Sequence, residues 1–291
     1  MPELPEVETI KNRLVNLVVG KPIVNIQVLR DKSFRGDPDK LIGLQFIKVT
    51  RRAKIINFHL AQNIDQSKNF GLSNLLIHLK MTGQLIYVDE NTKVGGGHPT
   101  ADWVNDLPSK HTRVIIQFVD KSNLFFNDMR VFGWVWLMDK DLVEQEFSKY
   151  GPDINDPSLG LAYLIASLKN RRIPIKQAIM DNKVIAGVGN IYASEALFVA
   201  GVHPQRPANS LREEEMSKLF IAMQKVIDRS IKLGGTTFDG KYVGVDGFAG
   251  GFQNELQVYG QNNKQCPNCG SLIKRIKLGG RGTFFCERCQ S

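Results

Sequence analysis

Apolar residues near the start of the chain recur at the spacing of one helical face. Pro5 stands near the beginning of this pattern and Gly20 just past its end, as is typical of helix boundaries. We therefore predict an amphipathic helix over residues 3–19. Its apolar face would consist of Val7, Ile10, Leu14, Leu17 and Val18.

Shorter apolar runs separated by turn residues follow, as far as about residue 140, and predict strands. They lie at Ile23–Leu29, Ile55–Leu60, Leu75–Val88 with a break at Thr82-Gly83, and Arg113–Leu137 with turns at 120–123 and near Asp128. Residues 1–140 are therefore expected to form a mostly β domain.

The pattern changes from about Tyr150. Gly151-Pro152 and Asp156-Pro157 indicate a linker. Helical patterns then occur at Leu161–Leu168, Ile175–Asp181, Asn190–Ala200 and Leu211–Leu233. The next 18 residues, 234–251, include 7 glycines and indicate a loop. We expect a helical domain, then this loop, then the segment that carries the cysteines.

Composition and charge narrow the class of protein. A chain of 291 residues with 42% hydrophobic residues can bury substantial cores, and its length suggests about two domains. The first residues do not have the pattern of a signal peptide, and no apolar segment reaches about 18 residues. We therefore expect a cytoplasmic protein without membrane association. Lysine and arginine outnumber acids 38 to 29, giving a formal charge of +9, which favours a nucleic-acid partner.

All four cysteines lie near the end of the chain, spaced C-x2-C-x16-C-x2-C: Cys266, Cys269, Cys286 and Cys289. This spacing is typical of one tetrahedral Zn²⁺ held by four thiolates. Four protein ligands leave no position open for water, so the predicted metal is structural. Between the cysteine pairs, 272–277 and 283–285 are expected to form a hairpin joined by 278–282, with Arg281 near its tip. Such an arginine either enters a DNA groove or is simply solvated.

Three separated motifs together resemble a known family. Residues 1–9 read MPELPEVET, residues 187–195 read GVGNIYASE, and the cysteine motif closes the chain. The sequence resembles the bacterial formamidopyrimidine-DNA glycosylases, essentially from end to end. The related endonuclease VIII branch usually opens Pro-Glu-Gly-Pro-Glu, whereas Leu4 follows Glu3 here. The resemblance therefore favours the branch that removes oxidised purines.

The resemblance implies an α+β protein with an N-terminal β-sandwich, a helix-two-turn-helix domain and a zinc-finger β-hairpin. The boundaries we expect are residues 1–140 for the sandwich and 141–155 for the linker. Residues 156–235 would form the helix-two-turn-helix domain, 236–261 a loop that covers the lesion and a connector, and 262–291 the zinc finger.

The resemblance assigns the chemistry to four residues. Pro2 would be the nucleophile that forms a Schiff base once Met1 is removed, because a free α-amine is far less protonated near neutral pH than a lysine. Glu3 would donate a proton, although a helix N-terminus favours its charged form. Lys54 would act on the sugar-phosphate during β-elimination, and Arg281 would assist δ-elimination. Taken without the family, Pro2 is a common residue at a helix start and Lys54 an ordinary surface lysine.

The resemblance also supplies contacts to damaged double-stranded DNA, bound by a monomer. A base that is flipped out leaves a gap, which Met81, Arg130 and Phe132 would fill. Without the family, Met81 and Phe132 would more often belong to a core. The implied DNA-contacting residues are His111, Arg130, Arg171 and Asn190. Asn190 is also expected to be the N-cap of its helix. Val131 stands where the family commonly has a second arginine, which puts the base preference in doubt.

Two other functions remain open. A non-catalytic zinc-ribbon protein that binds nucleic acid would account for the charge and the cysteines but not for the N-terminal motif. An endonuclease VIII-like enzyme for oxidised pyrimidines would share the nucleophile and differ in its base pocket.

Overall fold

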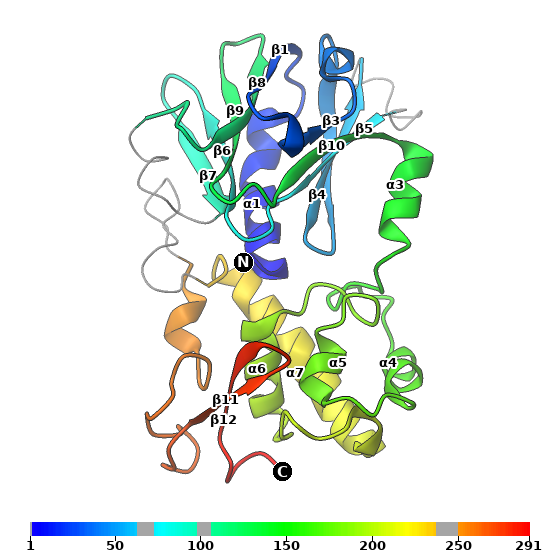
Figure 1. Cartoon of the computed structure of the whole chain (residues 1–291), viewed down its shortest axis with the longest axis vertical. Coiled ribbons are helices and arrows are strands. Elements are labelled where there is room, and N and C mark those ends of the chain that lie inside the picture. The colour runs from blue at the N-terminus through cyan, green and yellow to red at the C-terminus, as the bar shows by residue number, and fades with distance from the viewer. Residues whose placement is uncertain (1, 63–72, 98–105, 237–249) are drawn as a thin grey trace. The chain divides into compact units, whose positions relative to one another are not determined.

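The computed structural model describes residues 2–62, 73–97, 106–236 and 250–291 (Figure 1). The chain divides into two compact units. The first unit comprises residues 1–148 and 234–250, and the second comprises 149–233 and 251–291.

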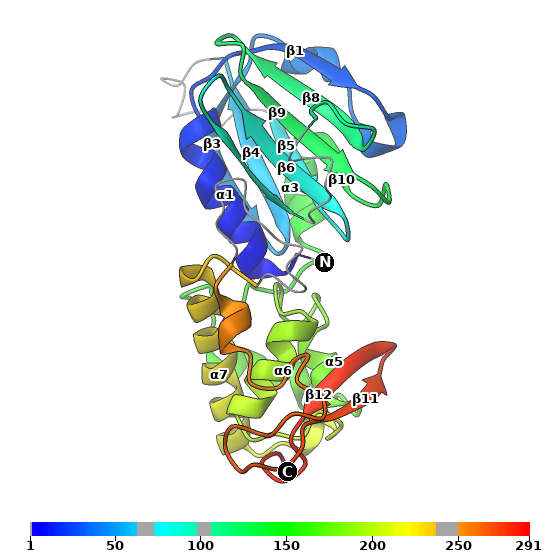
Figure 2. The ribbon, with the colours of Figure 1, turned by 90° about the vertical axis from the view of Figure 1, so that its left-hand side faces the viewer.

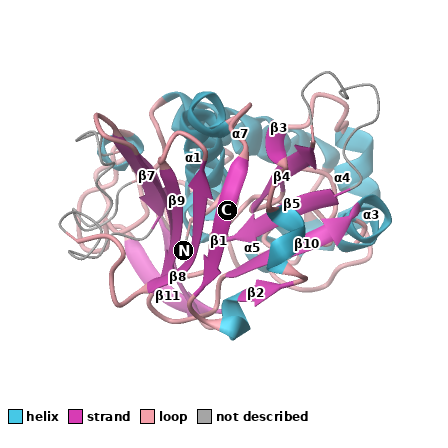
Figure 3. Cartoon of the chain, turned by 90° about the horizontal axis from the view of Figure 1, so that it is seen from above, coloured by secondary structure: helices cyan, strands magenta, loops and turns pink. Residues whose placement is uncertain are grey.

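The first unit is a β-sandwich with a long helix. Its helix α1 spans Leu4–Val18. The described residues form two five-stranded sheets, in the orders β1-β8-β9-β6-β7 and β2-β10-β5-β4-β3. Figures 2 and 3 show these sheets as two layers. The strands are β1 (Ile23–Val28), β2 (Phe34–Arg35), β3 (Gln45–Arg52), β4 (Ile55–Ala61), β5 (Ser73–His78), β6 (Gly83–Val88), β7 (Lys93–Gly97), β8 (Thr112–Phe118), β9 (Asn123–Asp128) and β10 (Trp134–Asp139).

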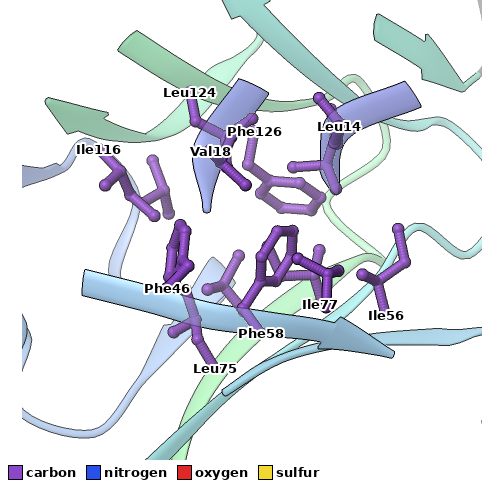
Figure 4. Packing of buried hydrophobic residues seen from close by; sticks show 14 of the residues in the cluster. Leu14, Val18, Phe46, Ile56, Phe58, Leu75, Ile77, Ile116, Leu124 and Phe126 are labelled. Carbon is purple, nitrogen blue, oxygen red and sulfur yellow. The ribbon is translucent and has the colours of Figure 1, made fainter. Parts of the chain in front are cut away.

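One apolar core joins α1 to both sheets (Figure 4). Leu14 and Val18 from the helix pack with Phe46, Phe58 and Phe126 from the strands. The rings of Phe46 and Phe58 lie 4.7 Å apart between centroids. The apolar face predicted for residues 3–19 is thus what the sandwich buries, and the predicted fold class is confirmed.

Four elements of this unit were not predicted, the first of which is the two-residue strand β2. β3 was missed because its side chains do not alternate cleanly between buried and exposed positions; residues 51 and 52, for example, are both half-buried. β7 has three successive glycines, which disfavour a strand in isolation. Gly96 fits because it lies against α1: a Cβ there would come within 2.6 Å of Ile10 Cγ1. Helix α3 (Lys140–Phe147) is short and directly follows β10.

The second unit is helical and ends in a hairpin. Its helices are α4 (Leu161–Leu168), α5 (Ile175–Ile179), α6 (Asn190–Val199) and α7 (Glu213–Lys232). The hairpin strands are β11 (Lys274–Leu278) and β12 (Arg281–Phe285), and β12 packs against α6. No helix among the described residues is long and apolar enough to cross a membrane.

Two local predictions were wrong. The hairpin turn is shorter than expected, because Leu278 pairs with Arg281 and only Gly279 and Gly280, both at positive φ, lie between the strands. Arg281 therefore begins β12. The N-cap of α6 is Gly189, and Asn190 is the first helical residue, because its side chain is directed to other groups described below.

Candidate functional site

The start of α1 gathers buried polar groups around Pro2. Pro2 is buried, and Glu3 and Glu6 are each 4% exposed. The backbone N–H of Glu3 donates to Glu6 Oε2 over 2.8 Å. Glu6 Oε1 accepts from the backbone N–H of Thr236 over 2.8 Å, so one carboxylate joins the helix start to the segment that opens the glycine-rich loop. Most of that loop lies outside the described residues.

Glu8 has a different role from its neighbours on α1. It accepts from Lys11 over 2.5 Å and from Arg51 Nε over 2.6 Å. Burial acts to raise the pKa of Glu8, but these cationic partners outweigh it and the pKa is lowered. Arg51 also donates to the Ala53 carbonyl over 2.8 Å, which attaches the β3–β4 turn to α1.

Lys54 lies in that turn and is only 5% exposed. Ala53, beside it, adopts a left-handed φ of 53°. Lys54 directly precedes β4, and the first residue of that strand, Ile55, pairs with His78 of β5. The structure therefore places Lys54 in a buried, strand-supported position and not on an ordinary solvated surface.

His78 stabilises the next turn in its neutral form. It is 7% exposed, and its pKa is lowered well below the usual value by burial, with further lowering by Lys80 and Lys54. Its Nδ1 accepts from the backbone N–H of Lys80 over 3.1 Å, so the ring proton lies on Nε2. Lys80 has a left-handed φ of 51°. This contact shapes the turn of residues 79–82 that carries Met81.

Asp128 connects this turn to the one after β9. Its carboxylate is fully buried and accepts from the Thr82 hydroxyl and, over 2.6 Å, from the backbone N–H of Gly133. The backbone N–H of Arg130 lies 3.0 Å from Thr82 Oγ1 and 3.2 Å from Asp128 Oδ1. One buried carboxylate therefore determines the conformation of both turns.

The side chains that these turns carry are exposed. Met81 is 39% exposed and Phe132 is 51% exposed, so neither belongs to the core. The Arg130 guanidinium lies over the Phe132 ring, 4.7 Å from its centroid. His111 is half-buried, and its carbonyl accepts from the backbone N–H of Asp128 over 2.9 Å. These four residues thus lie on or beside the two turns that Asp128 joins.

In the second unit, Asn190 connects α6 to the hairpin. Its Nδ2 donates to the Gly282 carbonyl over 3.1 Å and lies 3.4 Å from the Tyr259 hydroxyl. Lys176, 2% exposed, donates to Thr283 Oγ1 over 2.9 Å. The strand that begins with Arg281 is thereby attached to α5 and α6 at two points.

Glu195 stabilises the segment that carries Tyr259. Its buried carboxylate accepts from three successive backbone N–H groups, those of Gln257, Val258 and Tyr259, over 2.7–3.0 Å. Burial raises the pKa of Glu195, although these hydrogen bonds oppose the shift.

The two predicted arginines of this unit differ. Arg281 is exposed, and its side chain makes no ion pair with any residue that the structure describes. Arg171 pairs with Asp181 over 2.8 Å and is 34% exposed. A contact of Arg171 with a phosphate would therefore compete with this pair.

The four cysteines form one cluster. Their sulfur atoms all lie within 4.8 Å of one another, with Cys266 to Cys289 at 3.8 Å and Cys269 to Cys286 at 3.5 Å. A tetrahedral site with Zn–S bonds of about 2.3 Å requires sulfur atoms roughly 3.8 Å apart. The cluster therefore has the dimensions of a four-thiolate metal site. Gln290 links it to the helical body by donating to the Val202 carbonyl over 2.9 Å.

Several supporting residues were not identified from the sequence: Glu6 as a link to Thr236, His78, Thr82, Asp128, Lys176, Glu195 and Tyr259. Each acts through contacts with residues distant in the sequence, which no local pattern reveals. The motifs already contained Glu6 and Glu195, and the polar residues flanking Met81 and Arg130 were the available signal for Thr82 and Asp128.

Family models match nearly the whole chain. Residues 1–135 match the formamidopyrimidine-DNA glycosylase N-terminal domain, and residues 150–241 match the H2TH domain of the same glycosylase. Residues 263–291 match a zinc finger found in FPG and IleRS.

Similar proteins cover the chain completely. The formamidopyrimidine-DNA glycosylases of Rickettsia africae and Listeria innocua are 38% and 36% identical to it, over 100% of this chain and 99% and 100% of theirs. A Lactococcus lactis FPG mutant in complex with Fapy-dG containing DNA has a TM-score of 0.84 at 30% identity, covering 99% of both chains. The MutM (FPG) protein of Thermus thermophilus has a TM-score of 0.82 at 35% identity, covering 99% of this chain and 98% of its own. With these matches, the chain belongs to the formamidopyrimidine-DNA glycosylase family.

Proposed function

We propose that this enzyme is a bifunctional DNA glycosylase and AP lyase of base excision repair that removes oxidised purines such as 8-oxoguanine and formamidopyrimidines. The observation that carries the proposal is the buried start of α1, where Pro2 adjoins Glu3 and Glu6. The substrate is damaged double-stranded DNA, and the enzyme acts as a cytoplasmic monomer.

Pro2 is the nucleophile in this proposal. With Met1 attached, its nitrogen is an amide and has no usable lone pair, so Met1 must be removed. A free α-amine with a pKa of about 7.7–8.0 is roughly one third unprotonated at about pH 7.5, whereas a lysine is about 0.1% unprotonated. The positive end of α1 lowers the pKa of the amine further.

The reaction then follows from the amine. Its lone pair attacks C1′ of the deoxyribose, the C1′–O4′ and C1′–N bonds break, and the base departs. The nitrogen, which loses its proton, becomes an iminium. Loss of a proton from C2′ then expels the 3′ phosphate in β-elimination, and δ-elimination expels the 5′ phosphate. Hydrolysis of the iminium that remains adds water to C1′ and releases Pro2 as the free amine.

Glu3 donates the proton that the opening sugar ring requires. The positive end of α1 favours a charged carboxylate, so an acid role needs the desolvation that bound DNA supplies. Glu3 is already 4% exposed, which supports that role. Its neighbour Glu6 fixes the local backbone by accepting from the Glu3 N–H.

Lys54 lies beside the sugar-phosphate in this proposal and assists β-elimination. The buried β3–β4 turn supports this role, because Arg51 attaches that turn to α1. A lysine in this position also attracts the phosphate backbone.

The exposed turns fill the gap left by the flipped base. Met81 wedges into the stack, and Arg130 and Phe132 pair and stack at the vacated step. Their exposure and the mutual contact of Arg130 and Phe132 support this assignment. His111, Arg171 and Asn190 contact the phosphates, and Arg281 stabilises the 5′ phosphate as it leaves.

One structural Zn²⁺ completes the proposal. Cys266, Cys269, Cys286 and Cys289 would hold it as thiolates, and the sulfur spacing supports this ligand set. The metal supplies no chemistry to the reaction. It stabilises the hairpin on which Arg281 lies.

Parallel cleavage assays on duplexes with 8-oxoguanine or thymine glycol test the proposal. We expect kcat/KM to be higher on 8-oxoguanine, and Glu3→Gln to lower base release more than cleavage at a preformed abasic site. A preference for thymine glycol would indicate an endonuclease VIII-like specificity. Inactivity on both duplexes with tight DNA binding would indicate a non-catalytic binding protein.

A further inference from the structure

Polar side chains gather on the outer face of the second sheet, away from its apolar core. Thr50 pairs with Asn57 across β3 and β4, and His59 pairs with Asn74 across β4 and β5. Because side chains of a strand alternate between faces, Asn57 and His59 lie on the side of β4 opposite to Phe58, which is in the core. The strands thus place four hydrogen-bonding side chains side by side.

Helix α3 completes a cavity over these side chains. The cavity has a volume of about 310 Å³, near the lower end of the range of about 300–1,000 Å³ for small-molecule sites. Val143 and Phe147 of α3 supply an apolar wall, and Lys140 and Glu144, both exposed, lie at its rim. The site is therefore part apolar and part polar, as ligand sites are.

Two buried amides line the cavity with unused hydrogen-bonding capacity. Asn57 and Asn74 are each 3% exposed. Asn57 Oδ1 has no hydrogen-bond partner in the described parts of the chain, and the Asn74 side chain makes no hydrogen bond to them either. Asn57 is one of the residues that line the cavity, and the broad amide torsion of asparagine allows its oxygen to face a ligand there. Buried polar groups are normally hydrogen-bonded, so the buried Asn57 oxygen indicates a missing partner, and the Asn74 amide lies beside it with its own hydrogen-bonding groups free of any described residue.

The buried part of the lining disfavours a charged ligand. His59 is neutral, since burial and, less strongly, Lys48 lower its pKa. Its Nε2 lies 2.8 Å from the Thr50 hydroxyl. The charged residues of the lining are Lys140 and Glu144, which are opposite in sign and lie at the exposed rim. A buried phosphate or carboxylate would have no compensating charge there.

We propose that this cavity binds an uncharged planar heterocycle of nucleobase size, in which an N–H group lies beside a carbonyl. Such an edge presents one donor and one acceptor in a plane, which matches the amide edge of asparagine. The Phe147 ring packs against the heterocycle and excludes water. The site is separate from the residues assigned to catalysis, and the proposal does not rest on the proposed function.

Calorimetric titration of the full-length protein with uracil and with hypoxanthine tests the proposal. 1,3-Dimethyluracil is the matched control, because it keeps the ring and the carbonyls but has no N–H. We expect both bases to bind and the dimethylated base to bind about tenfold more weakly, the loss expected for about one hydrogen bond. Equal affinity for uracil and its dimethyl form, or no detectable binding of either base, would overturn the proposal.

Variants locate the binding. Leucine has nearly the same shape as asparagine, so Asn74→Leu should lower the affinity for uracil about tenfold. Asn123→Leu, the same change in the other sheet, should leave that affinity unchanged. Thr50→Val removes the hydroxyl that lies nearest to His59 Nε2 and leaves Asn57 Nδ2, at 3.4 Å, as its other neighbour. It is a second test variant if Asn74→Leu unfolds at a lower temperature than the unsubstituted chain. Both variants should cleave 8-oxoguanine duplexes as the unsubstituted chain does. Full uracil binding by Asn74→Leu and Thr50→Val would contradict the proposal, since the base would then lie elsewhere.

Discussion

The Thr82 hydroxyl donates to Asp128, and this buried contact joins two turns that are 46 residues apart in the sequence. The same carboxylate accepts from the backbone N–H of Gly133. The exposed side chains of Met81, Arg130 and Phe132 therefore depend on one residue that does not itself reach the surface.

Asp128→Asn should loosen both turns. The amide keeps the shape but presents a donor where the carboxylate accepts, so we expect the first unit to lose about 2 kcal/mol of unfolding free energy. Binding of a lesion duplex should weaken as well. Urea unfolding followed by tryptophan fluorescence measures the unfolding free energy of the first unit, because all three tryptophans precede residue 148.

Asp89→Asn is the matched control. Asp89 also accepts from two backbone N–H groups, those of Asn91 and Thr92, but it is only half-buried, whereas Asp128 is fully buried. Asp89→Asn should therefore lose less unfolding free energy than Asp128→Asn and should leave DNA binding unchanged. If the two variants behaved alike, Asp128 would not determine the turn conformations.

His78 should make stability depend on pH. Its folded-state pKa lies below the unfolded value of about 6.5, so acid protonates the unfolded chain first. Stability is therefore fully present above about pH 6.5 and is lost as the pH falls, by up to about 1.4 kcal/mol per pH unit for one such histidine. His78→Gln should flatten this slope between about pH 7 and 5.5, leaving the part due to His59 and His203, whose pKa values are also lowered.

Chemical unfolding at several pH values, followed by tryptophan emission, measures the slope. A variant as pH-dependent as the unsubstituted chain would show that folding does not lower the pKa of His78. The effect of burial on this histidine would then be contradicted.

Metal removal should unfold the hairpin and spare the sandwich. The segment 262–291 has few apolar residues, and four thiolates around one ion supply much of its folding free energy. Chelation, or Cys266→Ser, should abolish tight DNA binding while tryptophan emission stays native. Undiminished DNA binding by a metal-free protein would contradict a structural role.

Arg281→Ala should separate the two elimination steps. A guanidinium is charged at any working pH, so in the proposed reaction Arg281 stabilises the departing 5′ phosphate. We expect β-elimination product to accumulate over δ-product on an abasic-site duplex resolved by gel. Arg288→Ala removes another exposed arginine of the same finger and is the control. An unchanged product ratio with weaker binding would make Arg281 only a DNA anchor.

Local patterns predicted the elements but not the contacts between them. The apolar face of α1 and the runs at β4 to β6 are visible because helix and strand periods appear in single segments. β7 was not predicted because its glycines are explained only by the close packing of the strand against Ile10 of α1. α3 was not predicted because a helix of eight residues shows little periodicity in the sequence.

The site divides in the same way. The motifs indicated Pro2, Glu3 and the cysteines. Spacing predicted the cysteine cluster, because metal ligands recur at short intervals. The supporting groups could not be predicted: Glu6 contacts Thr236 across 230 positions, and Lys176 contacts Thr283 across 107. Asn190 was assigned to a cap because its side-chain partner, the Gly282 carbonyl, lies in the hairpin.

The central claim is that the Pro2 amine attacks the sugar. Incubation with an 8-oxoguanine duplex and borohydride should trap the iminium as a stable adduct, and mass spectrometry should place the DNA on residue 2 of a chain that has lost Met1. An adduct on Lys54, or a trapped chain that retains Met1, would contradict the account.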